Sequence, residues 1–401
     1  MNSYRTLDDF SPKGKRVLVR VDLNVPMQGK RITDKNRILK VLPTITRLSK
    51  AGAKVIILSH FGRPNSQYND DLSLKHLMPT MQDALKGFNI SFSNDCIGTL
   101  VHSDVDMMKE GDILLLENLR FHAGEELNDP CFSKKLSDLG DIFVNDAFSV
   151  SHRAHSSISS LAHLLPSYAG ILLQSELESL AQALETPQRP LGAIVGGAKV
   201  STKLKLLENL VKKVDLLIIG GGMANTFLFA RGIGIGKSLA ERDLAETVKN
   251  IEKAAGISGC KIVLQSDAVV ADELKQDPKI ETLPITSVPS DSMILDAGPA
   301  SIAEFSEQLS KCKTIIWNGP LGAFEISPFH ESTVSLAKFV GYSTRKRGIT
   351  SVAGGGDTVA ALTQAGVEEE FSYLSTAGGA FLEWLEGKEL PGIIALKVQN
   401  K

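Results

Sequence analysis

Short apolar runs alternate with longer amphipathic segments along almost the whole chain. The runs are continuous rather than broken by polar residues, which is typical of strands covered on both faces in a parallel sheet. In the first half they predict strands at residues 16–21, 54–59, 89–93, 112–117 and 141–145. In the second half they predict strands at 191–196, 214–219, 261–265, 292–296, 313–317 and 349–353. Strands that alternate with helices indicate the α/β class, with a doubly wound, Rossmann-like parallel sheet in each half.

The segments between the strands carry the end signals of helices. One helix is expected to have Thr33 as its N-cap and to end at Gly52. A shorter helix, Thr358 to Ala365, is expected to end at Gly366. Residues 167–190, SYAGILLQSELESLAQALETPQRP, predict one long helix followed by a proline-containing connector. Since 401 residues are enough for two or three domains, we expect this helix to join two domains of comparable size.

Composition and charge exclude several classes of protein. The formal net charge is only −2, from 44 basic and 46 acidic residues, so no overall nucleic-acid footprint is present. The four cysteines form no CxxC pair, which argues against a zinc site or a disulfide framework and favours free thiols. No signal segment or stretch of about 18 apolar residues is evident, so we expect a cytoplasmic protein without a membrane partner.

Basic and polar side chains follow the strands of the first half. They are Asp22, Asn24, Arg37, His60, Arg63, Arg120, His152, Arg153 and His155. Taken singly, each arginine is more often a surface charge, and the Asp22–Asn24 pair reads as an Asx turn before Pro26. Ligands of parallel sheets collect at the carboxyl ends of strands, and arginine forks suit carboxylate and phosphate. Together these residues predict a pocket for a small acidic substrate.

Glycines follow the strands of the second half. GGAKVSTK at 196–203 and GGGDT at 354–358 each follow a strand and open a helix, where bare backbone N–H groups can approach phosphate. Lys199 and Lys203 are expected at i and i+4 on one helix face, with phosphate oxygens between them. Asp357 is a candidate ligand of Mg²⁺, and Glu325 could accept hydrogen bonds from ribose. Each glycine cluster taken alone is more often a tight turn.

Two familiar nucleotide motifs are not satisfied. ARGIGIGKS has Arg231 where a Walker A loop needs its first glycine. The dinucleotide fingerprint GxGxxG fails because Asn225 and Val359 stand at its sixth position in the two candidate loops. The sequence therefore contains neither a common P-loop nor a standard NAD site.

Ten motifs in register resemble the phosphoglycerate kinase family, of the bacterial type. They are RVDLNVP, ITDKNRI, SHFGRP, ENLRF, NDAF with HRAH, GGAKVSTK, GGGMANTF, NGPLGAFE, GGGDT and STAGGA. The resemblance implies a phosphoglycerate-binding domain at 1–170, an interdomain helix and connector at 171–188 and a nucleotide-binding domain at 189–384. A tail at 385–401 is expected to return to the first domain. The substrates implied are 3-phosphoglycerate or 1,3-bisphosphoglycerate and ADP or ATP with Mg²⁺, on a monomer.

The resemblance also implies roles for individual residues. Substrate contacts fall on Asp22, Asn24, Arg37, His60, Arg63, Arg120 and Arg153. Nucleotide contacts fall on Lys203, Glu325, Gly354, Gly355, Gly356, Asp357 and Thr358, with Asp357 at the metal. The transferring phosphoryl group is expected to meet Arg37, Lys199, Gly355 and Gly378. The sequence departs from the family pattern at three positions: Phe61 stands where leucine is common, and Ser149 and Ala377 stand where glycine is usual. Ala377 would be strained if its φ were positive.

The implied reaction needs no general base. The carboxylate of 3-phosphoglycerate, with a pKa near ~4, is already ionised at neutral pH. We expect catalysis by positioning and charge neutralisation, with the two domains closing around the reactants. Two other classes stay open from the residues alone: a two-domain dehydrogenase with an atypical dinucleotide loop, and a two-lobed protein that binds small anions.

Overall fold

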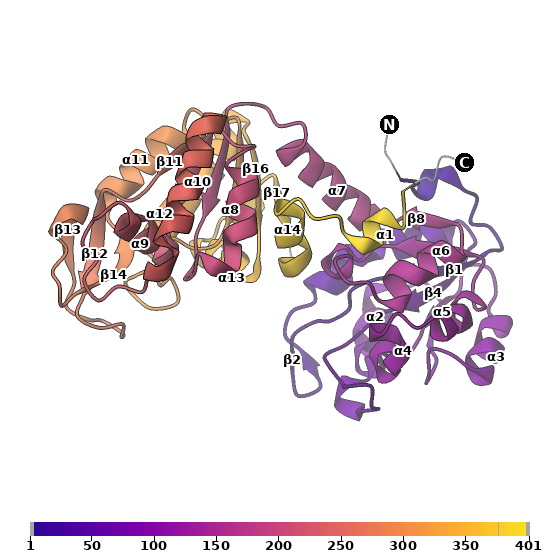
Figure 1. Ribbon diagram of the computed structural model, residues 1–401. Coiled ribbons are helices and arrows are strands. Elements are labelled where there is room, and N and C mark those ends of the chain that lie inside the picture. The colour runs from indigo at the N-terminus through magenta and orange to yellow at the C-terminus, as the bar shows by residue number, and fades with distance from the viewer. Residues whose placement is uncertain (1–3, 376, 398–401) are drawn as a thin grey trace. The chain divides into compact units, whose positions relative to one another are not determined.

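The computed structural model describes residues 4–375 and 377–397 (Figure 1). The chain divides into two compact units: the described residues of 1–177 and 389–401 form unit 1, and those of 178–388 form unit 2. The division falls inside helix α7, Ile171–Leu184. Residues 398–401 of the expected tail lie outside the described residues.

Unit 1 is built on a six-stranded sheet in which all neighbours are parallel, in the order β5-β6-β4-β1-β7-β8. Its strands are β1 (Arg16–Arg20), β4 (Lys54–Leu58), β5 (Ile90–Phe92), β6 (Ile113–Leu115), β7 (Ile142–Asn145) and β8 (Ser167–Ala169). Val17 and Val19 of β1 pack into one apolar cluster, whereas Leu18 between them packs into another. Both faces of the sheet are therefore covered, which explains why the apolar runs are continuous.

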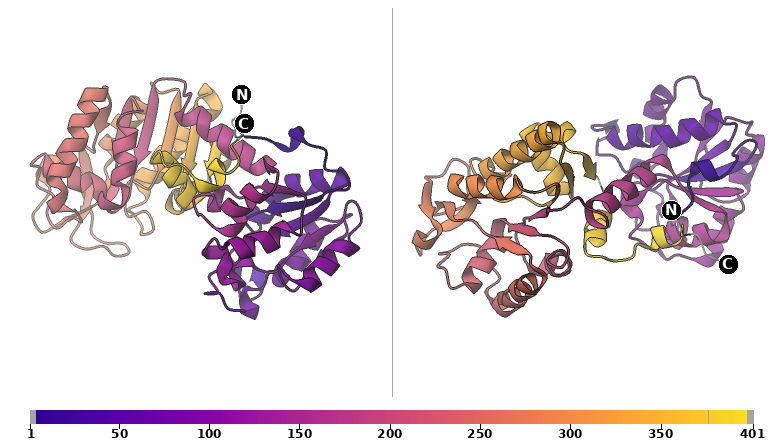
Figure 2. Two further views of the ribbon diagram at one scale, coloured as in Figure 1. Left: turned by 45° about the vertical axis from the view of Figure 1, so that its right-hand side comes forward. Right: turned by 90° about the horizontal axis from the view of Figure 1, so that it is seen from above.

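Helices cover the two faces of this sheet (Figure 2). Its helices are α1 (Asn36–Lys50), α2 (Met78–Ala84), α3 (Thr99–Met107), α4 (Ala123–Glu126), α5 (Pro130–Ser137), α6 (Leu161–Leu164) and α15 (Pro391–Ile394). A small hairpin, β2 (Met27–Gln28) with β3 (Arg31–Ile32), stands apart from the sheet. Short helical turns are η1 (Leu7–Asp9), η2 (Asp70–Leu72), η3 (Leu74–Leu77), η4 (Leu119–Phe121), η5 (Phe148–Val150) and η6 (Ser156–Ser160). The late helix α15 belongs to this unit, because Gly392 N donates to Ser151 O at 2.9 Å.

Unit 2 repeats the plan with the parallel order β11-β10-β9-β15-β16-β17. Its strands are β9 (Leu191–Val195), β10 (Leu216–Ile219), β11 (Lys261–Val263), β15 (Thr314–Asn318), β16 (Thr350–Gly354) and β17 (Tyr373–Ser375). A second sheet of three antiparallel strands contains β12 (Asp267–Ala271), β13 (Glu281–Pro284) and β14 (Met293–Ala297). The core on one face of the main sheet includes Trp317 of β15 and Phe305 of α11.

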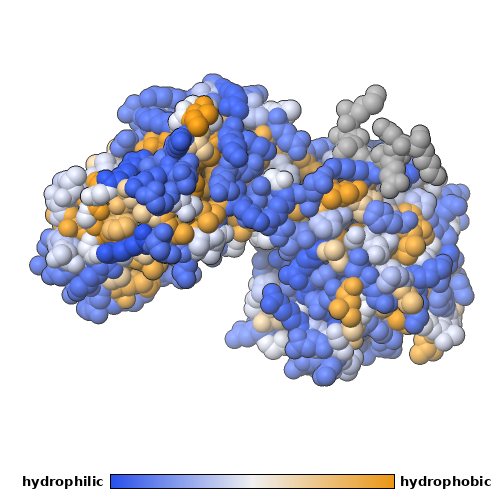
Figure 3. Space-filling view, in the orientation of Figure 1, coloured by the Kyte–Doolittle hydropathy of each residue, from blue (hydrophilic) through white to orange (hydrophobic). Residues whose placement is uncertain are grey.

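The helices of unit 2 lie between these strands in the chain. They are α8 (Leu204–Leu210), α9 (Gly221–Ala230), α10 (Ala245–Ser258), α11 (Pro299–Leu309), α12 (Glu331–Arg347), α13 (Gly356–Ala365) and α14 (Gly378–Leu385). The turns are η7 (Ser201–Lys203), η8 (Arg242–Leu244), η9 (Ile285–Ser287) and η10 (Glu368–Glu370). Hydrophilic residues cover most of the face drawn in Figure 3, with apolar residues among them, as is usual for a folded protein. Among the described residues, no helix has the length and apolar character needed to cross a membrane.

The α/β class and the parallel sheets are confirmed, with corrections to single elements. The run at 292–296 forms β14, which pairs antiparallel with β12 outside the main sheet. Residues 167–169 form β8 and not the start of the long helix. Thr33 is not an N-cap, because its hydroxyl donates to Pro26 O at 3.1 Å and α1 begins after Lys35 without a side-chain cap. The end of α13 at Gly366 is as expected.

One glycine at the end of a helix and one inside a helix give a test of this backbone. Gly366 has φ of +70° at the end of α13, and nothing lies within 4 Å of a Cβ built on it. Gly256 lies inside α10 with equally open surroundings and without a positive φ. We expect Gly366→Ala to lower the free energy of unfolding by about 1 kcal/mol and Gly256→Ala to raise it by about 0.5–1 kcal/mol.

Denaturant unfolding of the two variants beside the parent protein measures both effects. The two substitutions add the same methyl group to open space, so any difference in sign reports the backbone conformation alone. Equal changes for both variants would contradict the left-handed conformation of Gly366.

Candidate functional site

Asp22, directly after β1, is the centre of a polar cluster in unit 1. Arg37, the second residue of α1, places Nη1 2.5 Å from Asp22 Oδ2, and the Ser149 hydroxyl donates to the same oxygen at 2.5 Å. Asn24 N donates to Asp22 Oδ1 at 2.9 Å, so the Asx turn is present as well. Burial would raise the pKa of Asp22, but the charge of Arg37 and the hydrogen bonds from Ser149 and Asn24 N hold it below its ordinary value. Asp22 is therefore an ionised anchor rather than a proton acceptor.

The loop after β4 is tied to this cluster. Gly62 N donates to Asn24 Oδ1 at 2.9 Å, and Arg120 Nη1 donates to Gly62 O at 2.7 Å. His60 is buried, and burial together with the neighbouring arginines holds its pKa well below the usual value. The imidazole is consequently neutral near pH 7, although it lies among cations.

Arg120, Arg153 and Arg63 form a group of cations in which charge compensation is incomplete. Burial lowers the pKa of Arg120, Glu126 opposes this, and Arg153 and Arg63 lower it further by repulsion. Glu126 Oε1 lies 3.1 Å from Arg120 Nε without the alignment of a hydrogen bond. Arg153 Nε is buried and has no hydrogen-bond partner, while Arg63 is exposed. Cations held together in this way favour an anionic ligand.

The strand order explains why these residues meet. In unit 1 the connections from β1 and β7, which are neighbours, run to opposite sides of the sheet. Ligands bind at such a switch point, outside the carboxyl ends of the strands. The contact between Asp22 after β1 and Ser149 after β7 spans it. The structure thus brings together the substrate residues expected in the first half.

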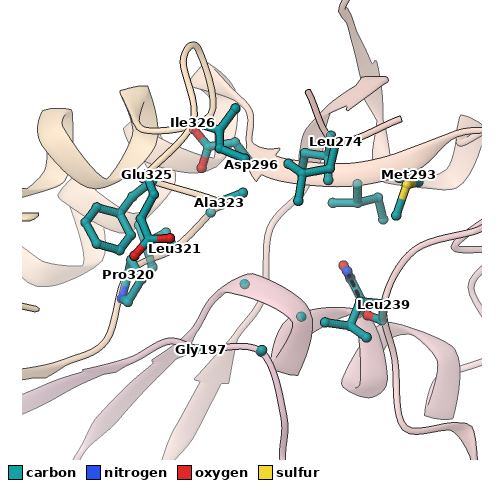
Figure 4. Close-up of a pocket in the computed structure, with 18 of the residues that line it drawn as sticks. Gly197, Leu239, Leu274, Met293, Asp296, Pro320, Leu321, Ala323, Glu325 and Ile326 are labelled. Atoms are coloured by element: carbon teal, nitrogen blue, oxygen red, sulfur yellow. Dashed lines mark hydrogen bonds between the residues drawn. The ribbon is translucent and has the colours of Figure 1, made fainter. Parts of the chain in front are cut away.

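Unit 2 has a pocket of about 500 Å³ (Figure 4). Leu239, Leu274 and Met293 lie on one side of it, and the segment 320–326 lies opposite. Gly197, Gly221 and Gly222 leave space at its wall, and the exposed carboxylates Glu325 and Asp357 line it. The volume and the largely apolar lining suit the base and sugar of a nucleotide.

Lys203 lies at the switch point of the second sheet. Its Nζ donates to Gly196 O at 2.6 Å and to Asn318 O at 3.3 Å, at the ends of the adjacent strands β9 and β15. Burial lowers the pKa of Lys203 to about 8, against the opposing effect of Asp357. Lys199 is exposed in the loop before η7, and α8 begins only at Leu204. The expectation that the two lysines share a helix face is wrong, because a 3₁₀ turn intervenes.

The GGGDT segment joins β16 to α13. Gly355 has φ of +101°, and a Cβ there would lie 2.7 Å from Asn318 Nδ2. The Thr358 hydroxyl donates to Gly354 O at 2.8 Å and accepts from Gly319 N at 2.8 Å. Gly355 and Thr358 therefore hold the N-terminus of α13 open and in place, with free backbone N–H groups for phosphate.

The second glycine segment begins helix α14 at Gly378. Ala377 precedes it with φ of −95°, so the alanine carries none of the positive-φ strain considered above. Nothing lies within 4 Å of a Cβ built on Gly378, which leaves its surroundings open.

In the part of the chain that is described, one group of three side chains could hold a metal ion: Asp95, Cys96 and His122 in unit 1. His122 Nε2 and Asp95 Oδ1 already pair at 2.7 Å, and Asp357 is not part of this group. A metal at Asp357 would therefore need ligands from the nucleotide.

Three buried residues under the unit 1 cluster were not anticipated. Arg20, Glu125 and Ser157 connect strand β1 to α4 and η6. The signal for Arg20 was present, because a lone arginine interrupts the apolar run VLVRV of the first strand. No local pattern points to Glu125 or Ser157 as its partners.

A cluster of arginines in one unit and a nucleotide-sized pocket beside glycine loops in the other fit a phosphotransferase of the α/β class. The sequence model of phosphoglycerate kinase matches residues 7–388. Phosphoglycerate kinases of Methylorubrum extorquens (strain PA1) and Rhizobium leguminosarum bv. trifolii (strain WSM2304) are each 57% identical, covering 100% and 99% of both chains. The solved phosphoglycerate kinase structure from Coxiella burnetii has a TM-score of 0.90 at 42% identity and 98% coverage of both chains. The chain belongs to the phosphoglycerate kinase family, a family of kinases that use ADP or ATP.

Family membership confirms the resemblance that the ten motifs indicated. It overrides the two open alternatives, the dehydrogenase and the anion-binding protein. The roles of single residues remain predictions.

The lowered pKa of Lys203 predicts a pH-dependent affinity for nucleotide. Below about pH 8 the amine carries its proton and attracts phosphate, and above that pH it loses the charge. We expect the dissociation constant for ATP to rise by up to about tenfold from pH 7.5 to 9, whereas Lys203→Arg keeps its charge and shows no such rise. Calorimetric titrations measure this, with Lys205→Arg on the exposed face of α8 as the control. An equal slope in the parent protein and in Lys203→Arg would contradict the assignment.

Proposed function

We propose that this protein catalyses reversible phosphoryl transfer between 1,3-bisphosphoglycerate and ADP, giving 3-phosphoglycerate and ATP, as a glycolytic and gluconeogenic enzyme. The observation that carries the substrate is the arginine group of unit 1. Arg120, Arg63 and Arg153 repel one another, and the buried Nε of Arg153 has no hydrogen-bond partner. A phosphate with a charge near −2 would relieve both conditions.

The remaining substrate contacts surround Asp22. We assign 3-phosphoglycerate binding to Asp22, Asn24, Arg37, His60, Arg63, Arg120 and Arg153. The carboxylate Asp22 and the amide of Asn24 suit the hydroxyl of the glycerate, and the cations suit its two anionic ends. The extent of unit 1 supports residues 1–170 as the phosphoglycerate-binding domain, with the described residues from Glu389 onward returning to it.

The pocket of unit 2 supports nucleotide binding within residues 189–384. Lys203 and the N–H groups of Gly354, Gly355 and Gly356 would meet the phosphates, Thr358 would fix the loop, and Glu325 would face the ribose. Asp357 fits Mg²⁺, because an exposed carboxylate at the pocket wall can share the ion with nucleotide phosphates. When bound, the ion would neutralise phosphate charge.

No side chain needs to remove a proton in this reaction. The nucleophile is the carboxylate of 3-phosphoglycerate in one direction and the β-phosphate of ADP in the other, and both are ionised at neutral pH. Asp22, a buried carboxylate among the assigned substrate residues, has a lowered pKa and stays ionised. Arg37, Lys199, Gly355 and Gly378 would instead stabilise the phosphoryl group in flight.

The two substrates are assigned to different units, so transfer requires the units to close around them. Helix α7 with the connector to residue 188 is the proposed hinge. We expect a cytoplasmic monomer whose radius of gyration falls when 3-phosphoglycerate and a MgATP analogue are both bound. Small-angle scattering checks this, and unchanged dimensions with both ligands would argue against closure.

A coupled assay tests the activity. The purified enzyme receives 3-phosphoglycerate and MgATP with excess glyceraldehyde-3-phosphate dehydrogenase, and NADH consumption is followed. We expect consumption only when enzyme, 3-phosphoglycerate and ATP are all present. Absence of turnover in a folded protein that binds MgATP would overturn the proposed reaction.

The same assay compares Lys199→Ala with Lys205→Ala. Both residues are exposed, but Lys205 lies on α8, away from the proposed path of the phosphoryl group. Loss of Lys199 is expected to lower kcat on the order of 10²–10³-fold, because one charge-stabilising donor is removed. Lys205→Ala should retain near-normal turnover, and equal activity of the two variants would remove Lys199 from the mechanism.

A further inference from the structure

Arg20 is a charged residue in the middle of a sheet. It ends strand β1 and is only 1% exposed, and no carboxylate of the described residues forms a salt bridge with it. Burial lowers its pKa to about 10, which still leaves the guanidinium charged at neutral pH. A buried charge is expensive unless hydrogen bonds satisfy it, so the partners of Arg20 indicate why it is retained.

Three donors of Arg20 have three different partners. Nε donates to Ser157 Oγ at 2.8 Å, Nη1 donates to the carbonyl of Val21, and Nη2 lies 3.2 Å from His60 Nδ1. A guanidinium has donors only, so His60 Nδ1 must be the acceptor. The proton of the neutral imidazole is then on Nε2.

The hydrogen bonds of Ser157 determine which groups donate and which accept in this arrangement. Its hydroxyl has one hydrogen, and since it accepts from Arg20 it donates that hydrogen to Glu125 Oε1, at 2.6 Å. Ser157 N donates to the other oxygen, Glu125 Oε2, at 3.0 Å. Glu125 is 0% exposed and accepts at both oxygens, as a carboxylate does. These four residues form a chain of hydrogen bonds, Glu125–Ser157–Arg20–His60, which we call the relay. In the relay the hydroxyl of Ser157 lies between the buried carboxylate of Glu125 and the buried guanidinium of Arg20.

The surroundings of His60 reinforce its neutral form. Asp22 after β1 would favour protonation, whereas Arg20 on β1, Arg120 on η4 and Arg37 on α1 all oppose it. The ring is buried among these charges, so desolvation also disfavours the imidazolium. Across the described residues, no protein group forms a hydrogen bond to Nε2.

We propose that Arg20, anchored by Ser157 and Glu125, is a positioning residue that presents His60 to the phosphoglycerate as a neutral donor through Nε2–H. The inference rests on the proposed function, since it supplies a hydrogen bond to that substrate. It gives the site a donor whose charge does not change across the physiological range, unlike an ordinary histidine. As a consequence, the pH dependence of the affinity for the anion follows the ionisation of the substrate and not that of His60.

The test uses nitrogen NMR of the imidazole rings in the ligand-free, full-length enzyme, with the His60 signals assigned from His60→Gln. The parent protein is expected to show the Nε2–H tautomer from pH 8 to below 6. Arg20→Lys offers a single point charge in place of the fork and should give a mixture of the Nδ1–H and Nε2–H tautomers, because the fixed donor to Nδ1 is lost. Ser157→Ala, which removes only a hydroxyl, should shift His60 in the same direction and guards against loss of folding in Arg20→Lys.

Ser156→Ala is the matched control. Ser156 is adjacent, equally buried, and donates to Gly124 O at 2.8 Å outside the relay. Kinetics give a second readout: in Arg20→Lys and Ser157→Ala, the KM for 3-phosphoglycerate should be at least about threefold higher than in Ser156→Ala across the pH profile from 8 to 6, because part of the His60 population no longer offers Nε2–H.

The two readouts separate the inference from the proposed function. An Nδ1–H or cationic His60 in the parent protein, or relay variants with the same tautomer ratio as Ser156→Ala, would overturn the inference. If the parent protein shows the expected tautomer but no turnover, the proposed reaction is wrong and the inference about the relay still holds. A loss of stability without any change in tautomer or pH profile would mean that Arg20 is only structural.

Discussion

Both candidate sites depend on one topological constraint: each six-stranded sheet is fully parallel, and its strand order reverses direction once. The carboxyl ends of all six strands lie on a single edge, and the two chain connections diverge at the reversal. In unit 1 the reversal lies between β1 and β7, where Ser149 reaches Asp22. In unit 2 it lies between β9 and β15, where Lys203 bonds to the last carbonyls of both strands. The same geometry thus produces an anion site twice from unrelated residues.

Desolvation then determines the protonation state of the side chains at the carboxyl ends of these strands. Burial lowers the pKa of His60 in unit 1 and of Lys203 in unit 2. Each candidate site therefore contains a basic side chain that loses its proton at a lower pH than it would in water. The pKa of Asp22 is lowered as well, although burial alone would raise it, because neighbouring charge and hydrogen bonds outweigh the burial. In unit 1 the hydroxyl of Ser157 connects Arg20 to the buried Glu125, whereas the Nε of Arg153 has no hydrogen-bond partner.

Much of the fold could be predicted from the chain, since a strand covered on both faces must be apolar throughout. The errors occurred where a partner far along the chain decides the outcome. The apolar run of β14 looks like the others, but β12 pairs with it antiparallel, and no local pattern shows the direction of a neighbour. The eight residues of GGAKVSTK were expected to begin a helix, whereas η7 intervenes and turns Lys203 toward the strand ends while Lys199 stays exposed.

The sequence by itself determined the class, the strands and the identity of the chemical groups, because apolar periodicity and short motifs are local properties of the chain. It also determined that arginines follow one set of strands and glycines the other. Only the tertiary structure decided that Arg20, Ser157 and Glu125 meet beneath His60, with Ser157 137 positions from Arg20. Burial and hydrogen-bond direction, which set the tautomer of a histidine and the charge of a lysine, arise from packing between distant segments and cannot be read from spacing along the chain.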